Sequence, residues 1–217
     1  MPSSFSSTLL HSRPRAREPR EQILDAALRL LAARGYEGVT LRQIGAEVGL
    51  HNSSLFHHFR SKGDLVTEIF HRVLDGVIAR LVPLDADHEP ELDRLVAVCL
   101  DVADHFAKAP EQARFVLRVV IGSPGFETYL RGIDRGDRNH PLVRLHSILW
   151  SWLERARARG RIRAVDVGQA TRNLFGVLLF DPALSQGFGD PDLPTAERRR
   201  RRATELAEFV RGALEAR

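Results

Sequence analysis

Residues 52–62 bring together small polar, histidine and lysine side chains that could bind phosphate. Residues 52–54 (Asn-Ser-Ser) open a predicted short helix, where the first backbone amides and the helix dipole favour an anion. Lys62 begins the next predicted helix and adds a cation that can hold a phosphate. His57 and His58 are adjacent, so they point about 100° apart on a helix and are poorly placed to ligate one metal. The segment therefore favours a surface that contacts nucleic acid over a metal site.

The rest of the sequence offers no recognisable catalytic constellation. We find no H-E-x-x-H, G-x-S-x-G or G-x-G-x-x-G motif and no phosphate loop. Cys99 lies in the apolar stripe of a predicted helix, which is typical of an inert buried thiol. His51, His57 and His58 are not expected to form a zinc site. We therefore expect no enzyme activity, no catalytic or metal-ligating residues and no cofactor.

Composition places the chain among globular proteins that do not cross a membrane. Its 217 residues are 43% hydrophobic and 28% charged, and no uncharged run approaches the 18 residues of a membrane-spanning helix. The first 20 residues lack the pattern of a secretory signal, and a single cysteine excludes an internal disulfide. We therefore expect a cytoplasmic protein.

The positive charge is concentrated at the N-terminus. Residues 1–80 hold 11 basic and 8 acidic residues, whereas residues 81–217 hold 21 and 20, within a net charge of +4. Most of the excess comes from Arg13, Arg15, Arg17 and Arg20. Three prolines and five serines in the first 20 residues predict that residues 1–19 form a disordered basic arm. Such an arm could lie along phosphate or enter a minor groove, or it could be a solvated tail.

Three predicted helices would position the phosphate-binding segment. Apolar spacing predicts a helix over residues 20–35, with Gly35 as its left-handed C-cap. Thr40 and Gln43 form a capping box that opens a second helix, which ends at Gly49. The third helix covers residues 52–59, and its Leu55 and Phe59 are expected to be core. Two short helices joined by a tight glycine turn make a helix-turn-helix.

The remaining chain also predicts helices, which gives an all-α fold of about nine helices. They cover residues 61–83, 90–106, 110–121, 140–159, 166–180 and 195–217. A loop with room for one turn of helix is expected at residues 122–138, which hold four glycines, and a break at residues 181–194, which hold three prolines. Pro83 is expected to end its helix.

Residues 40–65, TLRQIGAEVGLHNSSLFHHFRSKGDL, resemble the DNA-binding signature of the tetracycline-repressor (TetR) family. The family pattern is roughly T-x-R-x-I-A-x-x-A-G-V-S-x-x-x-L-Y-x-H-F-x-S-K-x-x-L, and nearly every anchor is present. The resemblance implies a DNA-binding domain at residues 20–66 and a ligand-sensing and dimerisation domain at residues 67–217. It does not indicate the effector.

The resemblance also implies which residues contact DNA: Thr40, Arg42, Asn52, Ser53, Ser54, Phe56, His57, His58 and Lys62. Phe56 stands where the family usually has a phosphate-contacting tyrosine, and its ring could touch a thymine methyl instead. His51 replaces the usual serine cap, so Asn52 could cap the helix or the helix start could shift by one residue. Gly45 replaces the usual alanine, at a cost of up to about 1 kcal/mol in helix stability.

The C-terminal region supplies candidates for two further surfaces. The last two helices would pair with those of a second subunit through Leu174, Leu178, Leu206, Val210 and Leu214, unless these residues are ordinary intramolecular core. Polar or aromatic residues on apolar faces are candidates for an effector pocket, with core as the alternative: Phe106, Phe115, Arg118, His146, Trp150 and Asn173. Pockets of this kind are mostly apolar, so we expect an apolar or aromatic small molecule. The arginines at residues 198–202 are expected to be solvated or ion-paired, as in Arg201 with Glu205.

Two functions follow from this interpretation. The first is a homodimeric repressor that binds double-stranded DNA at a palindromic operator and is released by a small molecule. The alternative is a DNA-binding activator or architectural factor of the same fold that needs no effector.

Overall fold

The computed structural model describes residues 18–121, 125–188 and 195–215, and over these residues the regular secondary structure is all helical, without a strand. The elements, in order, are α1 (Pro19–Arg34), α2 (Leu41–Glu47), α3 (Asn52–His58), α4 (Lys62–Asp85), α5 (Leu92–Lys108), α6 (Pro110–Phe115), the π-helix η1 (Val116–Ile121), α7 (Phe126–Gly132), α8 (Pro141–Ala158), α9 (Val167–Phe188) and α10 (Thr195–Leu214). The predicted all-α fold is confirmed. The basic arm at residues 1–19 lies almost wholly outside the described residues.

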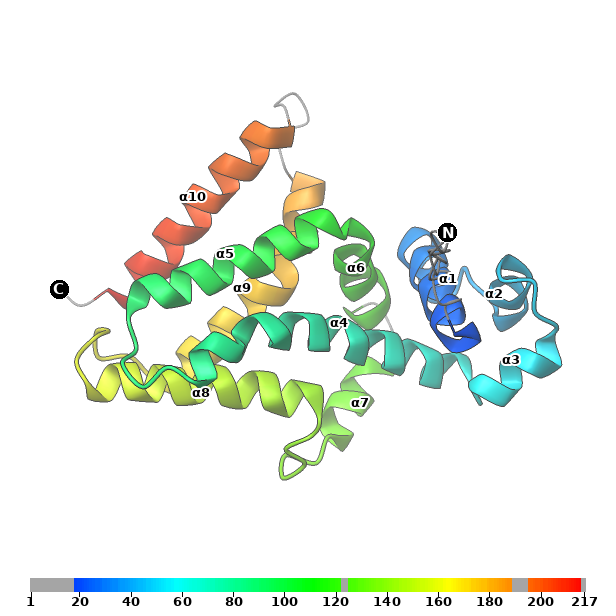
Figure 1. Cartoon of the computed structure of the whole chain (residues 1–217), viewed down its shortest axis with the longest axis horizontal. Coiled ribbons are helices and arrows are strands. Elements are labelled where there is room, and N and C mark those ends of the chain that lie inside the picture. The colour runs from blue at the N-terminus through cyan, green and yellow to red at the C-terminus, as the bar shows by residue number, and fades with distance from the viewer. Residues whose placement is uncertain (1–17, 122–124, 189–194, 216–217) are drawn as a thin grey trace, which may run out of the picture.

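Helices α1 to α3 form a small unit at one end of the molecule (Figure 1). The capping box of α2 is present as predicted: the Thr40 hydroxyl accepts the Gln43 amide at 3.3 Å, and Gln43 Oε1 accepts the Thr40 amide at 2.8 Å. Gly35 and Gly49 have φ values of 74° and 70°, a left-handed backbone that glycine adopts without a steric penalty. Both predicted glycine stops are therefore confirmed.

The long helix α4 connects this unit to the rest of the chain. Ser61 caps its start by accepting the Asp64 amide at 3.0 Å, as the sequence predicts. The prediction that Pro83 ends the helix is wrong, because α4 continues to Asp85. Leu84 is completely buried, so packing offsets the one backbone hydrogen bond that the proline removes.

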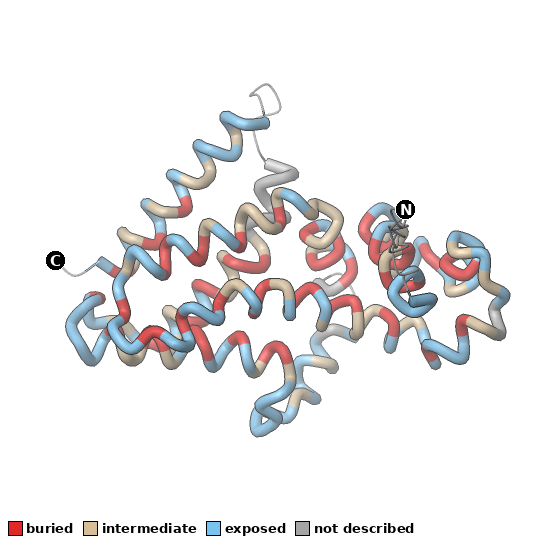
Figure 2. The backbone as a smooth tube through the Cα atoms, in the orientation of Figure 1, coloured by how far each residue is buried: buried red, intermediate tan, exposed pale blue. Residues whose placement is uncertain are grey.

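The C-terminal part is built around contacts of α4 with α8, α5 with α10, and α8 with α9. Buried faces of these helices turn toward one another, and exposed faces turn outward (Figure 2). At the far end of α4, the indole of Trp152 donates to the Asp87 carboxylate at 3.1 Å, and Arg155 donates to the carbonyls of Leu84 and Asp87 at 2.8 and 3.1 Å. These bonds satisfy the buried Asp87 and fix α8 against the end of α4.

Three helix boundaries differ from the sequence prediction. The predicted helix at 110–121 is divided into α6 and η1, and α7 lies within the expected loop at 122–138. A seven-residue helix is marginal alone, but Tyr129 of α7 packs edge-on against Phe70 with ring centroids 6.3 Å apart. Helix α9 continues to Phe188, through the proline at position 182.

The predicted dimer face is wrong, because its five residues are core of the protomer. They are only 0–8% exposed: Leu174, Leu178, Leu206, Val210 and Leu214. Helix α10 packs on α5, and Arg163 holds its end by donating to the carbonyls of Ala213 and Leu214 at 2.6 and 2.9 Å. The alternative interpretation, intramolecular core, is the one the structure supports.

Candidate nucleic-acid interface

Helix α3 turns one side into the N-terminal unit and the other toward solvent. Leu55 and Phe59 are 0% and 3% exposed, as expected of core, whereas Phe56 is 53% exposed. His57 and His58 are exposed beside it. A large exposed aromatic ring on a polar helix end is a feature of contact surfaces. Phe56 therefore lies where a partner could cover it.

Helix α2 adds two exposed side chains from the same part of the unit, Thr40 and Arg42. Asn52 and Ser53 lie in the first turn of α3, and Ser54 behind them is partly buried. The sequence left the capping of α3 open. The structure starts the helix at Asn52, with His51 in the cap position making no side-chain cap bond. Asn52 is therefore the first helical residue and not the cap.

Lys62 is held inside the unit. Its ammonium donates to the carbonyls of Tyr36 and Val39 at 2.8 and 3.1 Å and lies 4.0 Å from the centre of the Tyr36 ring. These bonds fasten the turn between α1 and α2 to the start of α4. The phosphate contact stays a prediction, and the structure adds a structural role that the family signature did not indicate.

Ion pairs fix α1 against α4. The guanidinium of Arg20 pairs with Glu68 and lies 5.0 Å from the centre of the Phe59 ring, at the end of α3. Arg72 of α4 pairs with Asp25 of α1 at 2.8 Å. Arg20, which the sequence places at the start of the first predicted helix, lies in the first turn of α1. Arg20 therefore links α1 both to α4 and to Phe59, the residue that follows α3.

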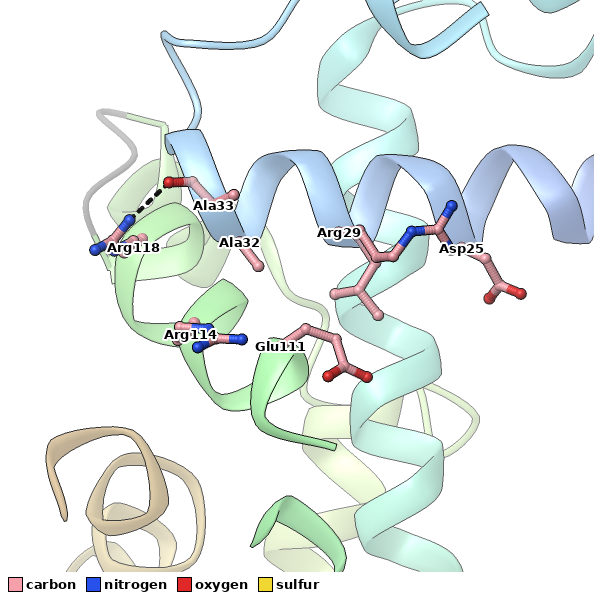
Figure 3. A pocket seen from close by; sticks show the side chains of 8 residues that line it. Asp25, Arg29, Ala32, Ala33, Glu111, Arg114 and Arg118 are labelled. Atoms are coloured by element: carbon pink, nitrogen blue, oxygen red, sulfur yellow. Dashed lines mark hydrogen bonds between the residues drawn. The ribbon is translucent and has the colours of Figure 1, made fainter. Parts of the chain in front are cut away.

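A groove of about 790 Å³ lies between α1 and the α6–η1 segment (Figure 3). It is lined by Asp25, Leu28, Arg29, Ala32, Ala33, Glu111, Arg114 and Arg118. Arg118 of η1 reaches across one end and donates to the Ala33 carbonyl near the end of α1 at 2.8 Å. The groove is thus a seam between the N-terminal unit and the C-terminal helices. Of the six predicted pocket residues, Arg118 is the one that lines it.

The structure does not bring the other predicted pocket residues together. Phe106 and Phe115 are completely buried in the core. His146 and Trp150 are exposed on α8, with their rings stacked at 5.7 Å, and Asn173 is exposed on α9. Both α8 residues lie one position away from the buried leucine stripe, which periodicity alone did not resolve. The six residues therefore do not line one pocket. Two lie in the core, three face outward, and Arg118 lines the groove.

Two features of the described residues bear on metal binding and thiol chemistry. No group of three His, Cys, Asp or Glu side chains there is placed to hold a metal ion. Burial raises the pKa of the Cys99 thiol to about 12, so it stays protonated and unreactive at neutral pH. Within the same residues, no helix has both the length and the apolar character needed to cross a bilayer.

Comparison with known proteins agrees with the geometry of this N-terminal unit. The family described as "Bacterial regulatory proteins, tetR family" matches residues 23–69, from α1 into α4. The HTH-type transcriptional repressor KstR2 of Rhodococcus jostii is 34% identical over 88 residues, which is 39% of this chain and 43% of that protein. The transcriptional regulator AcrR of Shigella flexneri is 38% identical over 55 residues, covering 25% of this chain and 26% of that protein. The chain thus matches less than half the length of these relatives.

The fold likeness extends over nearly the whole chain. The structure of the ketosteroid regulator KstR2 of Mycobacterium tuberculosis covers 94% of this chain and 98% of its own, with a TM-score of 0.64 and 22% identity. Residues 23–69 thus match the TetR family model, and the chain as a whole shares the fold of this regulator. The transcriptional regulator FadR of Bacillus subtilis, solved in complex with stearoyl-CoA, has a TM-score of 0.69 at 19% identity and covers 88% of this chain and 96% of its own. At these identities the two structures show a shared fold and not a shared ligand.

Proposed function

We propose that the protein is a sequence-specific, DNA-binding transcriptional regulator, most simply a homodimeric repressor that a small molecule releases from its operator. The observation that carries the proposal is the outward face of α2 and α3, which displays Arg42, Phe56, His57 and His58 above a capped and buried frame. The family match and the printed names of the relatives, which are repressors and regulators, support it. Bacterial DNA lies in the cytoplasm, where this function would operate.

In this proposal residues 20–66 bind DNA and residues 67–217 sense ligand and dimerise. Helix α3 enters the major groove with residues 52–54 leading, and Phe56 contacts a thymine methyl. Arg42, with the two histidines of α3, contacts the phosphate backbone. Such phosphate contacts set position and affinity, whereas the groove contacts of α3 set sequence preference.

Homodimerisation needs an outward face other than the buried leucines, and α8 with α9 offers one. Trp150 is 41% exposed, although tryptophan usually buries most of its surface. Its ring rests on Gly168 of α9, where an added Cβ would lie 3.3 Å from the indole. Two copies of α8 and α9 can form a four-helix bundle around this face. The dimer would place two α3 helices in successive major grooves, about 34 Å apart, on a palindromic site.

The seam between α1 and α6–η1 is the proposed route from ligand to DNA. A ligand that binds better to one arrangement of the C-terminal helices would increase the population of that arrangement. The position of α1 would change with it, and so would the position of α3. Arg118, which ties η1 to the end of α1, is the direct contact across this seam. We keep an apolar or aromatic small molecule as the expected effector and assign no cofactor and no enzyme activity.

Selection of bound duplexes from a random-sequence pool tests the proposal. The expected result is enrichment of an inverted repeat whose two half-sites are about one helical turn apart. The Arg42→Gln variant should then bind the selected site more weakly. The matched control is Arg131→Gln, since Arg131 is on α7 and pairs only with exposed Glu127 in the described residues. A pool without enrichment, or equal losses in the two variants, would contradict the proposed surface.

A further inference from the structure

A chain of three side chains joins α4, α7 and α8 just beyond the N-terminal unit. Nε2 of His71 on α4 lies 2.8 Å from the hydroxyl of Tyr129 on α7, which lies 3.0 Å from Nε2 of His140. His140 is the N-cap of α8, where its Nδ1 accepts the Leu142 amide at 3.2 Å. One hydrogen-bonded path therefore links the side of α4 to the first turn of α8.

The cap bond determines where the protons lie. Because Nδ1 of His140 accepts an amide proton, the neutral ring carries its own proton on Nε2 and donates it to the Tyr129 oxygen. The Tyr129 hydroxyl then donates to Nε2 of His71, whose proton is on Nδ1. Every bond in the chain is satisfied when both imidazoles are neutral.

Adding a proton to either ring breaks this pattern. A proton on Nδ1 of His140 would face the Leu142 amide, so two donors would meet at the start of α8. A proton on Nε2 of His71 would give the Tyr129 oxygen two donors and leave its own hydrogen without its acceptor. The two imidazole centroids are 5.1 Å apart, so two positive charges there would also repel.

The surroundings of His71 favour its neutral form. Burial is the largest cause that lowers the pKa of His71, and the neighbouring His140 lowers it further, whereas Asp75 and Glu68 of α4 raise it. Both carboxylates have other cationic partners: Asp75 faces Arg144 of α8 at 3.9 Å, and Glu68 pairs with Arg20 of α1.

The tyrosine does not titrate in the same range. Burial raises the pKa of Tyr129 to about 12, so its hydroxyl remains protonated at physiological pH. On the same helix, Glu127 and Arg131 form an exposed ion pair at 2.6 Å, so the two charges of α7 balance each other. His71, whose pKa burial lowers, is therefore the group of this chain of side chains that gains a proton as the pH falls.

We propose that His71, Tyr129 and His140 form a proton-operated latch, closed at neutral pH and opened by acidification, that ties α7 to α4 and α8. Opening removes the cap of α8 and loosens α7 from the part of α4 that follows the DNA-binding unit. The link to DNA affinity rests on the proposed function, whereas the latch itself does not. The device would make the regulator respond to pH independently of any effector.

Hydrogen–deuterium exchange of the full-length protein at pH 7.5 and pH 5.5 tests the latch. After correction for intrinsic exchange rates, protection of α7 and of the Leu142 amide should fall at pH 5.5 by up to about tenfold for each pH unit below the latch pKa. In Tyr129→Phe, which keeps the ring but loses the hydroxyl, protection should already be low at pH 7.5 and should change little with pH. Unchanged protection in the wild type would overturn the latch.

The chain offers a matched control in its other tyrosine. Tyr36→Phe also loses a hydroxyl, far from α7, and should reproduce the wild-type pH response. If Tyr129→Phe and Tyr36→Phe behave alike, the latch is wrong. A spectroscopic readout is added by the ¹⁵N shifts of the histidine rings, which should show Nδ1 of His140 unprotonated at pH 7.5. A protonated Nδ1 would contradict the bond assignment.

DNA binding by the same variants separates this proposal from the proposed function. Any pH dependence that arises within the DNA-binding unit itself should be common to all variants. The latch predicts a further pH dependence that Tyr36→Phe retains and Tyr129→Phe loses. If no variant binds DNA, the proposed function is contradicted, but the exchange result still tests the latch. If Tyr129→Phe and Tyr36→Phe show identical pH profiles of DNA binding, the link between the latch and DNA affinity is contradicted.

Discussion

Replacement of Lys62 by methionine tests whether this residue holds the N-terminal unit together. The change keeps an unbranched side chain of similar length but removes the ammonium that donates to the carbonyls of Tyr36 and Val39. Hydrogen bonds with a charged partner contribute about 1.5–3 kcal/mol each, and an exposed cation–π contact contributes about 0.5–1 kcal/mol. Since Lys62 is only partly buried and water can replace it at both carbonyls, we discount the sum to about 2–3 kcal/mol of unfolding free energy.

Urea denaturation followed by circular dichroism measures this loss, and the only other lysine of the chain provides the control. Lys108 is 69% exposed and pairs with Asp104 along one helix at 2.5 Å, an arrangement that contributes about 0.3–0.5 kcal/mol. Lys62→Met should therefore lower the urea midpoint far more than Lys108→Met. Equal, small losses in the two variants would refute the clamp. A salt slope of DNA binding reduced by about one in Lys62→Met, without loss of stability, would instead assign the residue to phosphate.

Three further outcomes follow from the structure. Thr40→Ala should cost about 1 kcal/mol in a thermal melt because it removes the cap of α2, whereas Thr40→Ser should cost much less. Trp150→Glu should give a monomer in sedimentation at micromolar concentration. Leu130→Glu changes a similarly exposed residue on α7 and should leave the dimer intact. A monomeric wild type would contradict the proposed dimer face of α8 and α9. Burial first, and then the charge of Arg80, lower the pKa of His105 below its ordinary value of 6.5. Its contribution to stability is therefore complete above the unfolded-state value of 6.5 and is lost as the pH falls below 6.5 through the lower folded-state pKa. His105→Gln should flatten the stability loss between pH 7.5 and pH 5.5, and an unchanged slope would refute the assignment.

The sequence was most informative where a local hydrogen bond or a backbone angle determines the element. The cap at Thr40 and the left-handed turns at Gly35 and Gly49 require particular residue types, so their positions could be predicted. Prolines were less informative. Pro83 lies inside a helix because the buried leucines around it outweigh one lost backbone bond.

The surfaces were harder to predict because they depend on which helices meet. Periodicity marked Leu206 and Val210 as apolar, but it could not indicate that α5 of the same chain covers them. His146 and Trp150 differ by one helical position from buried residues, and this small rotation places them outside the core. The bond from Lys62 to the turn before α2 joins residues 23 positions apart, and the bond from His71 to Tyr129 joins residues 58 positions apart. No spacing pattern in the sequence predicts such bonds.

The central claim, that α3 reads DNA in a dimer, is tested most directly by fluorescence-anisotropy titration across a salt series. The purified protein is titrated against the intergenic DNA upstream of its own coding sequence and against a random duplex of equal length. The account predicts tight binding of two protomers to the upstream fragment, with weaker and more salt-dependent binding to the random duplex. Equal, steeply salt-dependent binding to both duplexes, or binding to neither, would contradict recognition of a local operator by this protein.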